Sequence, residues 1–267
     1  MKILVSQSPF LSFLILAKPI KMKTLVLLGY GKMARALALG LKEKANIQVA
    51  GRNPQKIREF CDDLGLTPLS QNNNLIKVQD QEILLCVKPY ALQSFQFVGK
   101  AKCVYSILNA ITLETLRNRI ESEAFIRAMP NVAASVGKSI TSLCGDEVYK
   151  QRAFEIFNSI GKSVWIEEKM ISGATSLGGC APAFLAMVAE SLVDAGVTNG
   201  LTRNESKEIV EGLFEGFGTL LQTTHPALLK ESVMSPGGST AQGVASLEKN
   251  SLRNTFFEAV LASKNFA

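Results

Sequence analysis

The residues with the clearest chemical meaning lie in a glycine-rich run that follows a short apolar segment, 24–28. The run reads GxGxxA and consists of Gly29, Tyr30, Gly31, Lys32, Met33 and Ala34. In this pattern Gly29 permits a tight turn, Gly31 lets a pyrophosphate approach the backbone, and Ala34 allows a helix to pack closely on a sheet. The N-terminus of that helix favours an anion. The run therefore predicts a dinucleotide-binding turn.

The end of the second expected strand indicates which dinucleotide is bound. An NAD site usually has an Asp or Glu about 20 residues after the glycine run, where it binds the ribose 2′-hydroxyl. This chain has Arg52 there, within the sequence AGRNP at 50–54. A guanidinium pairs with a 2′-phosphate through two hydrogen bonds. We therefore expect NADPH to be preferred and NADH to remain possible; the alternative is that Arg52 is only a solvated loop charge.

Three further clusters could hold a ligand. Val87-Lys88-Pro89 and Met129-Pro130-Asn131 each end an expected strand, and doubly wound sheets bind ligands at that edge. A third cluster, SPGGST at 235–240, precedes an expected helix. Its backbone N–H groups, hydroxyls and positive helix end suit a small carboxylate. The alternative for this loop is an ordinary helix cap.

An alternation of apolar runs and helical stretches would position these residues. Near-continuous apolar strands separated by helices predict a parallel sheet covered on both faces. Residues 22–166 are therefore expected to form an α/β, Rossmann-like doubly wound domain. The expected strands are Thr24–Leu28, Ile47–Ala50, Ile83–Val87, Cys103–Ile107, Phe125–Ala128 and Ser163–Ile166. The expected helices are Met33–Lys44, Pro54–Leu64, Ala91–Val98, Leu113–Asn118 and Glu147–Ile160.

Residues 167–267 carry helical signals and predict an all-helical second domain. Pro182 suits the first turn of a helix, and Thr202 with Glu205 reads as a capping box for a helix to about Thr223. Two further helices are expected at Ser239–Lys249 and Leu252–Phe266. The helix expected from Thr202 to about Thr223 contains three glycines, Gly212, Gly216 and Gly218. They suggest close backbone approach between subunits, and the alternative is that they are merely tolerated.

Charge and composition exclude several classes of protein. Three of the six net positive charges come from lysines in residues 1–21, which have no acid, and the remainder is too scattered for a nucleic-acid surface. The apolar run at 10–17 resembles a signal-peptide core but is shorter than the roughly 20 residues that span a bilayer. We expect residues 1–21 to be a leader outside the folded core, with Met22 as the true start, and we expect a cytoplasmic protein without membrane or nucleic-acid partners.

The histidine and cysteine counts limit the chemistry. One histidine, His225, excludes a multi-histidine metal cluster, so no metal site is expected, and we interpret His225 as structural or surface-exposed. The five cysteines are odd in number and unpaired in spacing, which favours a reducing compartment. If the protein is an enzyme, a cofactor is expected to carry the chemistry.

Taken together, the motifs resemble pyrroline-5-carboxylate reductase. The likeness rests on the glycine run, VKP at 87–89, RAMPN at 127–131, GCAPAF at 179–184, the segment 190–203, and SPGGST, and it runs from about residue 23 to 266. It implies NAD(P)H-dependent reduction of 1-pyrroline-5-carboxylate to L-proline, in a homo-oligomer whose helical domains form the dimer.

The resemblance also implies individual roles. Thr240 would hydrogen-bond the substrate nitrogen as the catalytic contact, and Ser235, Gly238 and Ser239 would hold its carboxylate. Lys88 and Pro89, with Val87, would lie beside the nicotinamide and ribose. Asn73 aligns with an asparagine that contacts the cofactor ribose, and Asn109 and Ala110 stand where the family approaches the nicotinamide.

Departures from the family leave rival functions open. Ala110 replaces a family glycine, and Val132, Ala133 and Cys180 replace other residues of the family motifs. A non-catalytic NADP-binding sensor is therefore one alternative. The β-hydroxyacid dehydrogenases are a second, but they use a helical lysine, and this chain has no lysine between Lys169 and Lys207.

Overall fold

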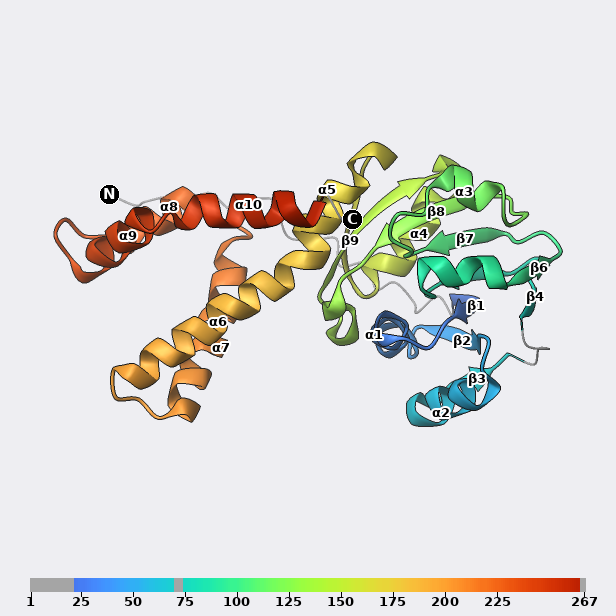
Figure 1. The fold of residues 1–267 in the computed structure, drawn as a ribbon, viewed down its shortest axis with the longest axis horizontal. Helices are drawn as coiled ribbons and strands as arrows, with labels where there is room; N and C mark the ends of the chain where they lie inside the picture. The colour runs from blue at the N-terminus through green and yellow to red at the C-terminus, as the bar shows by residue number, and fades with distance from the viewer. Residues whose placement is uncertain (1–21, 70–73, 265–267) are drawn as a thin grey trace, which may run out of the picture.

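The computed structural model describes residues 22–69 and 74–264. The expected leader lies outside these residues. The N-terminal half contains an eight-stranded sheet in the order β10-β9-β8-β7-β5-β1-β2-β3 (Figure 1). Its strands are β1 (Met22–Leu28), β2 (Ala45–Ala50), β3 (Thr67–Pro68), β5 (Glu82–Leu85), β7 (Cys103–Ser106), β8 (Phe125–Met129), β9 (Ser139–Gly145) and β10 (Gly161–Trp165).

Helices cover both faces of this sheet. Alternate side chains of its central strands point to opposite faces and pack into two apolar cores. Leu25 and Leu27 of β1 lie in one core, whereas Val26 and Leu28 lie in the other. The first core includes side chains of α1 (Lys32–Leu41), α2 (Pro54–Leu64) and α4 (Lys150–Asn158). The second includes those of α3 (Leu113–Arg117) and the 3₁₀ helix η1 (Pro89–Ser94). The predicted doubly wound α/β domain is confirmed.

Two strands, β9 and β10, depart from the predicted parallel arrangement and run opposite to the other six strands of this sheet. β9 pairs antiparallel with β8 and parallel with β10, so the sheet is mixed. The sequence analysis missed β9 because its residues, SITSLCG, are rich in hydroxyl groups rather than continuously apolar. Two of these hydroxyls have partners inside the fold: the buried Ser139 Oγ accepts a hydrogen bond from the backbone N–H of Asn131 at 3.1 Å and lies 3.4 Å from Thr141 Oγ1. A strand of this composition can then lie in the core without unpaired polar groups.

Two predicted helices are wrong in extent. The helix expected at 91–98 is instead η1, which begins at Pro89, followed by strand β6 (Gln96–Val98). Ser94 Oγ donates to the carbonyl oxygen of Ala91, and Phe95 is extended and buried, so the turn ends there. β6 pairs with β4 (Leu75–Lys77) in a separate two-stranded sheet. The helix expected at 147–160 is divided into the 3₁₀ turn η3 (Glu147–Tyr149) and α4.

The C-terminal half is helical, as expected. The capping box is confirmed, because Glu205 Oε2 accepts from the backbone N–H of Thr202 at 2.8 Å and Thr202 Oγ1 accepts from that of Glu205 at 3.2 Å. Pro182 lies in the first turn of its helix, also as expected. The elements are η4 (Glu168–Met170), α5 (Ile171–Thr175), the π turn η5 (Ser176–Cys180), α6 (Ala181–Thr198), α7 (Arg203–Leu220), α8 (Pro226–Ser232), α9 (Ser239–Lys249) and α10 (Leu252–Lys264).

Helices α6 to α10 extend away from the sheet and form an arm (Figure 1). Within the described chain, α6 has no buried side chain and α7 buries only Ser206 and Val210. The continuous helix from Glu168 to Thr198 is long and apolar enough to cross a membrane by length and composition, yet only 6% of its most apolar window is buried. The arm therefore exposes a large apolar area; its exposed side chains include Leu185, Met187, Leu192, Leu213, Phe217 and Phe257.

Candidate cofactor and active site

The glycine turn follows β1 directly and its backbone conformation requires glycine at the first position. Gly29 has φ +131°, and its N–H donates to the carbonyl oxygen of Ala50 at 2.8 Å. A Cβ at this position would lie 2.7 Å from the carbonyl oxygen of Cys86. Both the conformation and the space exclude a side chain, so Gly29 locks the end of β1 between its two neighbouring strands.

The rest of the turn presents the N-terminus of α1 to an open space. Gly31 is the N-cap residue with φ −83°, and in the described part of the chain nothing lies within 4 Å of a Cβ built on it. The first turn of α1 has no acidic residue. Ala34 is buried against the sheet. Free N–H groups at a helix end without a nearby carboxylate suit a pyrophosphate.

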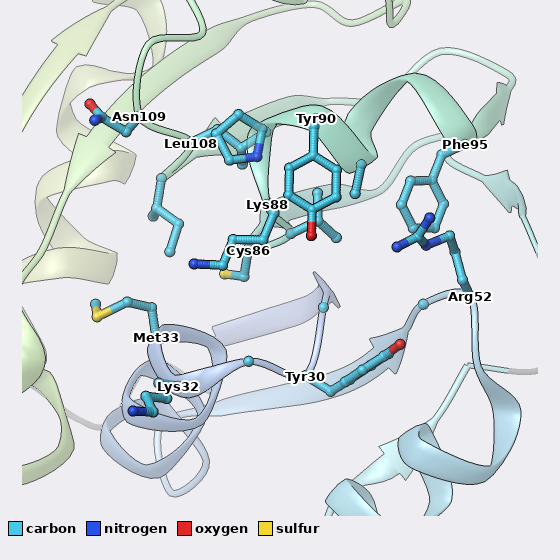
Figure 2. A pocket seen from close by; sticks show the side chains of 17 residues that line it. Tyr30, Lys32, Met33, Arg52, Cys86, Lys88, Tyr90, Phe95, Leu108 and Asn109 are labelled. Atoms are coloured by element: carbon cyan, nitrogen blue, oxygen red, sulfur yellow. The ribbon is translucent and has the colours of Figure 1, made fainter. Parts of the chain in front are cut away.

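A cavity of about 600 Å³ lies over this turn at the carboxyl edge of the sheet. Figure 2 shows its two walls: Tyr30, Lys32 and Met33 on one side, and Lys88 and Leu108 on the other. The cavity is lined by predicted residues from four separate segments, namely Gly29, Tyr30, Gly31, Lys32, Met33, Arg52, Val87, Lys88, Pro89 and Asn109. The fold thus gathers residues that are up to 80 positions apart in the chain.

Arg52 lies at the end of β2 and points toward this space (Figure 2). Its side chain is exposed, and Asn53 beyond it caps α2 by accepting the N–H of Lys56 at 3.0 Å. Gly51 packs under the ring of Tyr30, because a Cβ there would lie 2.9 Å from Tyr30 Cε1. The arrangement leaves a cation beside an aromatic wall, where a charged phosphate can be bound.

The sequence analysis missed two aromatic residues of the cavity, Tyr90 and Phe95. Tyr90 is 78% exposed and reaches into the cavity opposite Tyr30 (Figure 2). Its position directly after VKP was the signal that could have found it. An exposed ring that lines a cavity offers a flat surface for a planar ligand. Phe95 is buried and closes the floor behind it.

Two predicted cofactor residues, Ala34 and Ala110, are not part of this lining, and a third, Asn73, lies outside the described residues. Ala34 lies beneath the turn in the core. Ala110 follows the lining residue Asn109 and has φ +60°, a conformation that favours glycine. The structure therefore shows a backbone reason for the family glycine that Ala110 replaces.

The cysteines and the histidine have structural surroundings. Burial raises the pKa of the Cys86 thiol, which keeps it protonated at the cavity wall, and burial also raises the pKa of Cys144 to about 11. Cys61 and Cys103 are buried too, so four of the five cysteines are small core residues. His225 is exposed and its Nδ1 accepts the N–H of Ala227 at 3.2 Å, as a helix cap. Residues 22–69 and 74–264 contain no cluster of metal-ligating side chains.

The SPGGST loop forms a tight turn at the start of α9. The N–H of Gly238 donates to the carbonyl oxygen of Ser235 at 3.0 Å, and Gly237 has φ +72°. Ser235, Ser239 and Thr240 are exposed. Figure 1 places α9 at the far end of the arm from the glycine turn. Within one chain, the substrate residues expected from the sequence and the cofactor cavity therefore do not meet.

A doubly wound domain with a glycine turn at a helix N-terminus and an arginine after the second strand defines the class of NAD(P)-dependent oxidoreductases. A family model described as NADP oxidoreductase, coenzyme F420-dependent, matches residues 24–109, and one described as pyrroline-5-carboxylate reductase dimerisation matches residues 168–267. The chain belongs to the pyrroline-5-carboxylate reductase family.

Relatives across bacteria and plants support this assignment over the full fold. The pyrroline-5-carboxylate reductase of Helicobacter pylori J99 is 34% identical over 247 residues, covering 89% of this chain and 96% of that protein. That of Pisum sativum is 32% identical and covers 90% and 93%. Among solved structures, the Streptococcus pyogenes enzyme has a TM-score of 0.79 at 25% identity, covering 91% and 96%. The Plasmodium falciparum enzyme, solved with NADP bound, has a TM-score of 0.74 at 31% identity, covering 91% and 97%.

Proposed function

We propose that this protein reduces 1-pyrroline-5-carboxylate to L-proline with NADPH, NADH remaining possible, as the last step of proline biosynthesis. The observation that carries the proposal is the cavity over the glycine turn in a chain of this family. The bound cofactor supplies a hydride to the carbon of the C=N bond. The chain's own part is to hold cofactor and imine in reacting geometry and to stabilise charge.

Different residues of the N-terminal domain, 22–166, bind different parts of the cofactor. The N–H groups of the turn from Gly29 to Met33 bind the pyrophosphate at the start of α1. Arg52 pairs with the 2′-phosphate and thereby favours NADPH. Asn73, Val87, Lys88, Pro89, Asn109 and Ala110 bind the ribose and nicotinamide side.

The helical domain, 167–267, supplies the substrate loop. The hydroxyls of Ser235 and Ser239, with the N–H of Gly238 and the start of α9, hold the carboxylate of the imino acid. Thr240 hydrogen-bonds the ring nitrogen and so orients the C=N carbon toward the nicotinamide. A threonine hydroxyl can both donate and accept, which suits a nitrogen whose protonation changes during the reaction.

A second copy of the chain completes each site. The exposed apolar faces of α6, α7 and α10 need cover, and the substrate loop lies at the end of the arm away from its own cavity. A homodimer built through the arms covers the apolar area and brings each loop to the partner's cofactor. Within the apolar helix, Asp194 pairs with Arg203 of α7 at 3.0 Å, and a bilayer would bury this exposed ion pair at high cost. We accordingly propose a cytoplasmic homo-oligomer without membrane or nucleic-acid partners.

The test is turnover with a screen of cyclic imino acids and both cofactors. Oxidation of NADPH that requires 1-pyrroline-5-carboxylate and yields L-proline supports the reductase. Tight NADPH binding with no turnover on any imine would instead support a non-catalytic sensor. The same protein at low concentration, analysed by ultracentrifugation, is expected to remain dimeric or larger.

A further inference from the structure

A single carboxylate joins three elements at the junction between the sheet and the arm. Oε1 of Glu168 accepts a hydrogen bond from Nη1 of Arg127 at 3.1 Å. The same oxygen accepts the backbone N–H of Leu113 at 2.8 Å. These three residues are far apart in sequence, and no motif of the cofactor or substrate site includes Glu168.

Glu168 and its two partners lie in three different elements of the fold. Leu113 begins α3, and it lies four positions after Asn109, which lines the cofactor cavity together with Ile107 and Leu108. Arg127 lies in β8, in the middle of the sheet. Glu168 is the first residue of the continuous helix that runs to Thr198 and forms the base of the arm. The carboxylate therefore connects the base of the arm to the first residue of α3, four positions beyond the cavity-lining Asn109.

The burial of Arg127 makes this connection costly to break. Its side chain is only 5% exposed, and among the described residues its Nε has no hydrogen-bond partner. Glu168 is the carboxylate that compensates this buried cation. Removing one partner of a buried ion pair leaves an uncompensated charge, which strongly destabilises the arrangement around it.

A second contact, from Asn131 just beyond the end of β8, holds the same helix ten residues further along, at Gly178. Nδ2 of Asn131 donates to the carbonyl oxygen of Gly178, within the π turn, at 3.0 Å. Side-chain hydrogen bonds thus join the base of the arm to the sheet region at Glu168 and at Gly178, and Ile171 between them packs with Met129 and Cys144. Of the two hydrogen-bonded points, the one at Glu168 also contacts the first residue of α3. Rotation of the arm about its base must move or break the Glu168 contacts.

We propose that Glu168 is a positioning residue for imine reduction: through Leu113 and Arg127 it sets the arm, which carries the substrate loop, at a fixed angle to the wall of the cofactor cavity. This inference rests on the proposed function. Since hydride transfer requires reacting atoms about 3–3.5 Å apart, a small change of this angle is enough to reduce the rate. Glu168 itself contacts neither cofactor nor substrate.

The chain offers a matched control in a second buried ion pair. Glu82 at the start of β5 accepts Arg152 of α4 at 2.9 Å, and the two side chains are 7% and 20% exposed. Glu82 lies at the opposite edge of the sheet from the cavity, because β5 runs from Glu82 toward Cys86. The Glu82→Ala substitution therefore measures the cost of losing a buried pair without disturbing the arm.

The kinetic experiment compares Glu168→Ala, Glu168→Gln and Glu82→Ala in the intact oligomer, well below their melting temperatures. We expect Glu168→Ala to lower kcat/KM for the imine at least about tenfold while the Kd of NADPH changes less than about threefold. Glu168→Gln keeps an oxygen acceptor and should restore most of the lost activity. Glu82→Ala should lose stability but retain kcat/KM within about twofold. Equal kinetic losses in Glu168→Ala and Glu82→Ala, or none in either, would overturn the proposal.

Hydrogen exchange tests the same connection without turnover. NADPH binding to the wild-type protein should slow exchange in residues 107–113 and also in 168–176, and Glu168→Ala should abolish the second effect. Absence of this effect in the wild type would overturn the inference even for a fully active enzyme. A protein that shows the effect but reduces no imine would overturn only the proposed function.

Discussion

Asn131 and Gly178 join the end of β8 to the π turn of the arm through a hydrogen bond of 3.0 Å. Asn131 is buried, and its Oδ1 also accepts the N–H of Ala133 at 3.2 Å. A π turn leaves backbone groups without their usual helical partners, and here a side chain of the sheet supplies one. The MPN motif therefore supports the arm rather than the cofactor cavity.

Replacing Asn131 by alanine should destabilise the fold. The change leaves the carbonyl oxygen of Gly178 and the N–H of Ala133 without their partner, a cost of about 1–3 kcal/mol in the free energy of unfolding. Urea titration measures it. The control is Asn46→Ala, which removes an exposed bond to Thr24 and should cost less than about 0.5 kcal/mol. Equal costs would mean that the contact with the π turn contributes nothing.

Replacing Arg52 by alanine should change cofactor selectivity. Loss of a charge-assisted pair with the 2′-phosphate should weaken NADPH at least about tenfold, with little effect on NADH. Fluorescence titration gives both Kd values, and Arg58→Ala, an exposed arginine on α2, is the control. If both cofactors weaken equally, another residue binds the 2′-phosphate.

The two glycines of the turn should respond differently to alanine. Gly29→Ala places a Cβ 2.7 Å from the Cys86 carbonyl oxygen at φ +131°, so it should reduce the free energy of unfolding by more than about 2 kcal/mol. Gly31→Ala meets open space in the described chain and should leave stability unchanged while weakening NADPH. Thermal melts with and without NADPH separate the effects. A stable Gly29→Ala variant, or an unstable Gly31→Ala variant, contradicts this account of the turn.

Replacing Thr240 by alanine should reduce catalysis rather than cofactor binding. We expect kcat/KM for the imine to fall at least about tenfold, equivalent to about 1.4 kcal/mol of transition-state stabilisation. Ser246→Ala, an exposed change on the same helix α9, is the control and should leave steady-state kinetics unchanged. Unchanged kinetics in Thr240→Ala would remove this residue from the mechanism.

Stability should fall in acid in part through Asp146. Hydrogen bonds from Arg117 and from the backbone N–H of Phe125 lower the pKa of this carboxyl group. A depressed pKa in the folded state gives stability above the unfolded value of about 3.9, which is lost as pH falls through the folded value. Melting temperatures from about pH 5 downward should therefore drop less steeply in Asp146→Asn than in the wild type. Asp62→Asn, exposed on α2, should follow the wild-type curve, and identical curves for Asp146→Asn would refute the assignment.

Sequence patterns predicted the parts of the fold in which the local composition matches the surroundings, such as apolar strands that lie in the core. β1, β5 and β7 contribute buried apolar side chains to both faces of the sheet, and the turn from Gly29 to Ala34 has the spacing expected where a strand passes into a helix. β9 escaped prediction because its hydroxyl-rich sequence lacks the continuous apolar pattern of the other buried strands. Likewise, no local pattern reveals that Phe95 ends η1 by entering the core.

The sequence identified most residues of the candidate site one by one, but it could not show how they lie relative to one another in space. Arg52 and Lys88 have recognisable neighbours in sequence, whereas Tyr90 acquires its place only when η1 turns it toward Tyr30. Spacing also cannot show that the loop of Thr240 lies at the end of an arm. That relation depends on how α6 leaves the sheet, which contacts such as Glu168 with Arg127 determine.

The most direct measurement for the central claim follows the hydride itself. The protein is supplied with 1-pyrroline-5-carboxylate and NADPH deuterated at nicotinamide C4, and the product is analysed by mass spectrometry and NMR. The account predicts L-proline with one deuterium on the ring carbon that was the C=N carbon, formed in equal amount to NADP⁺. Consumption of NADPH without labelled proline, or no consumption with this imine, would contradict it.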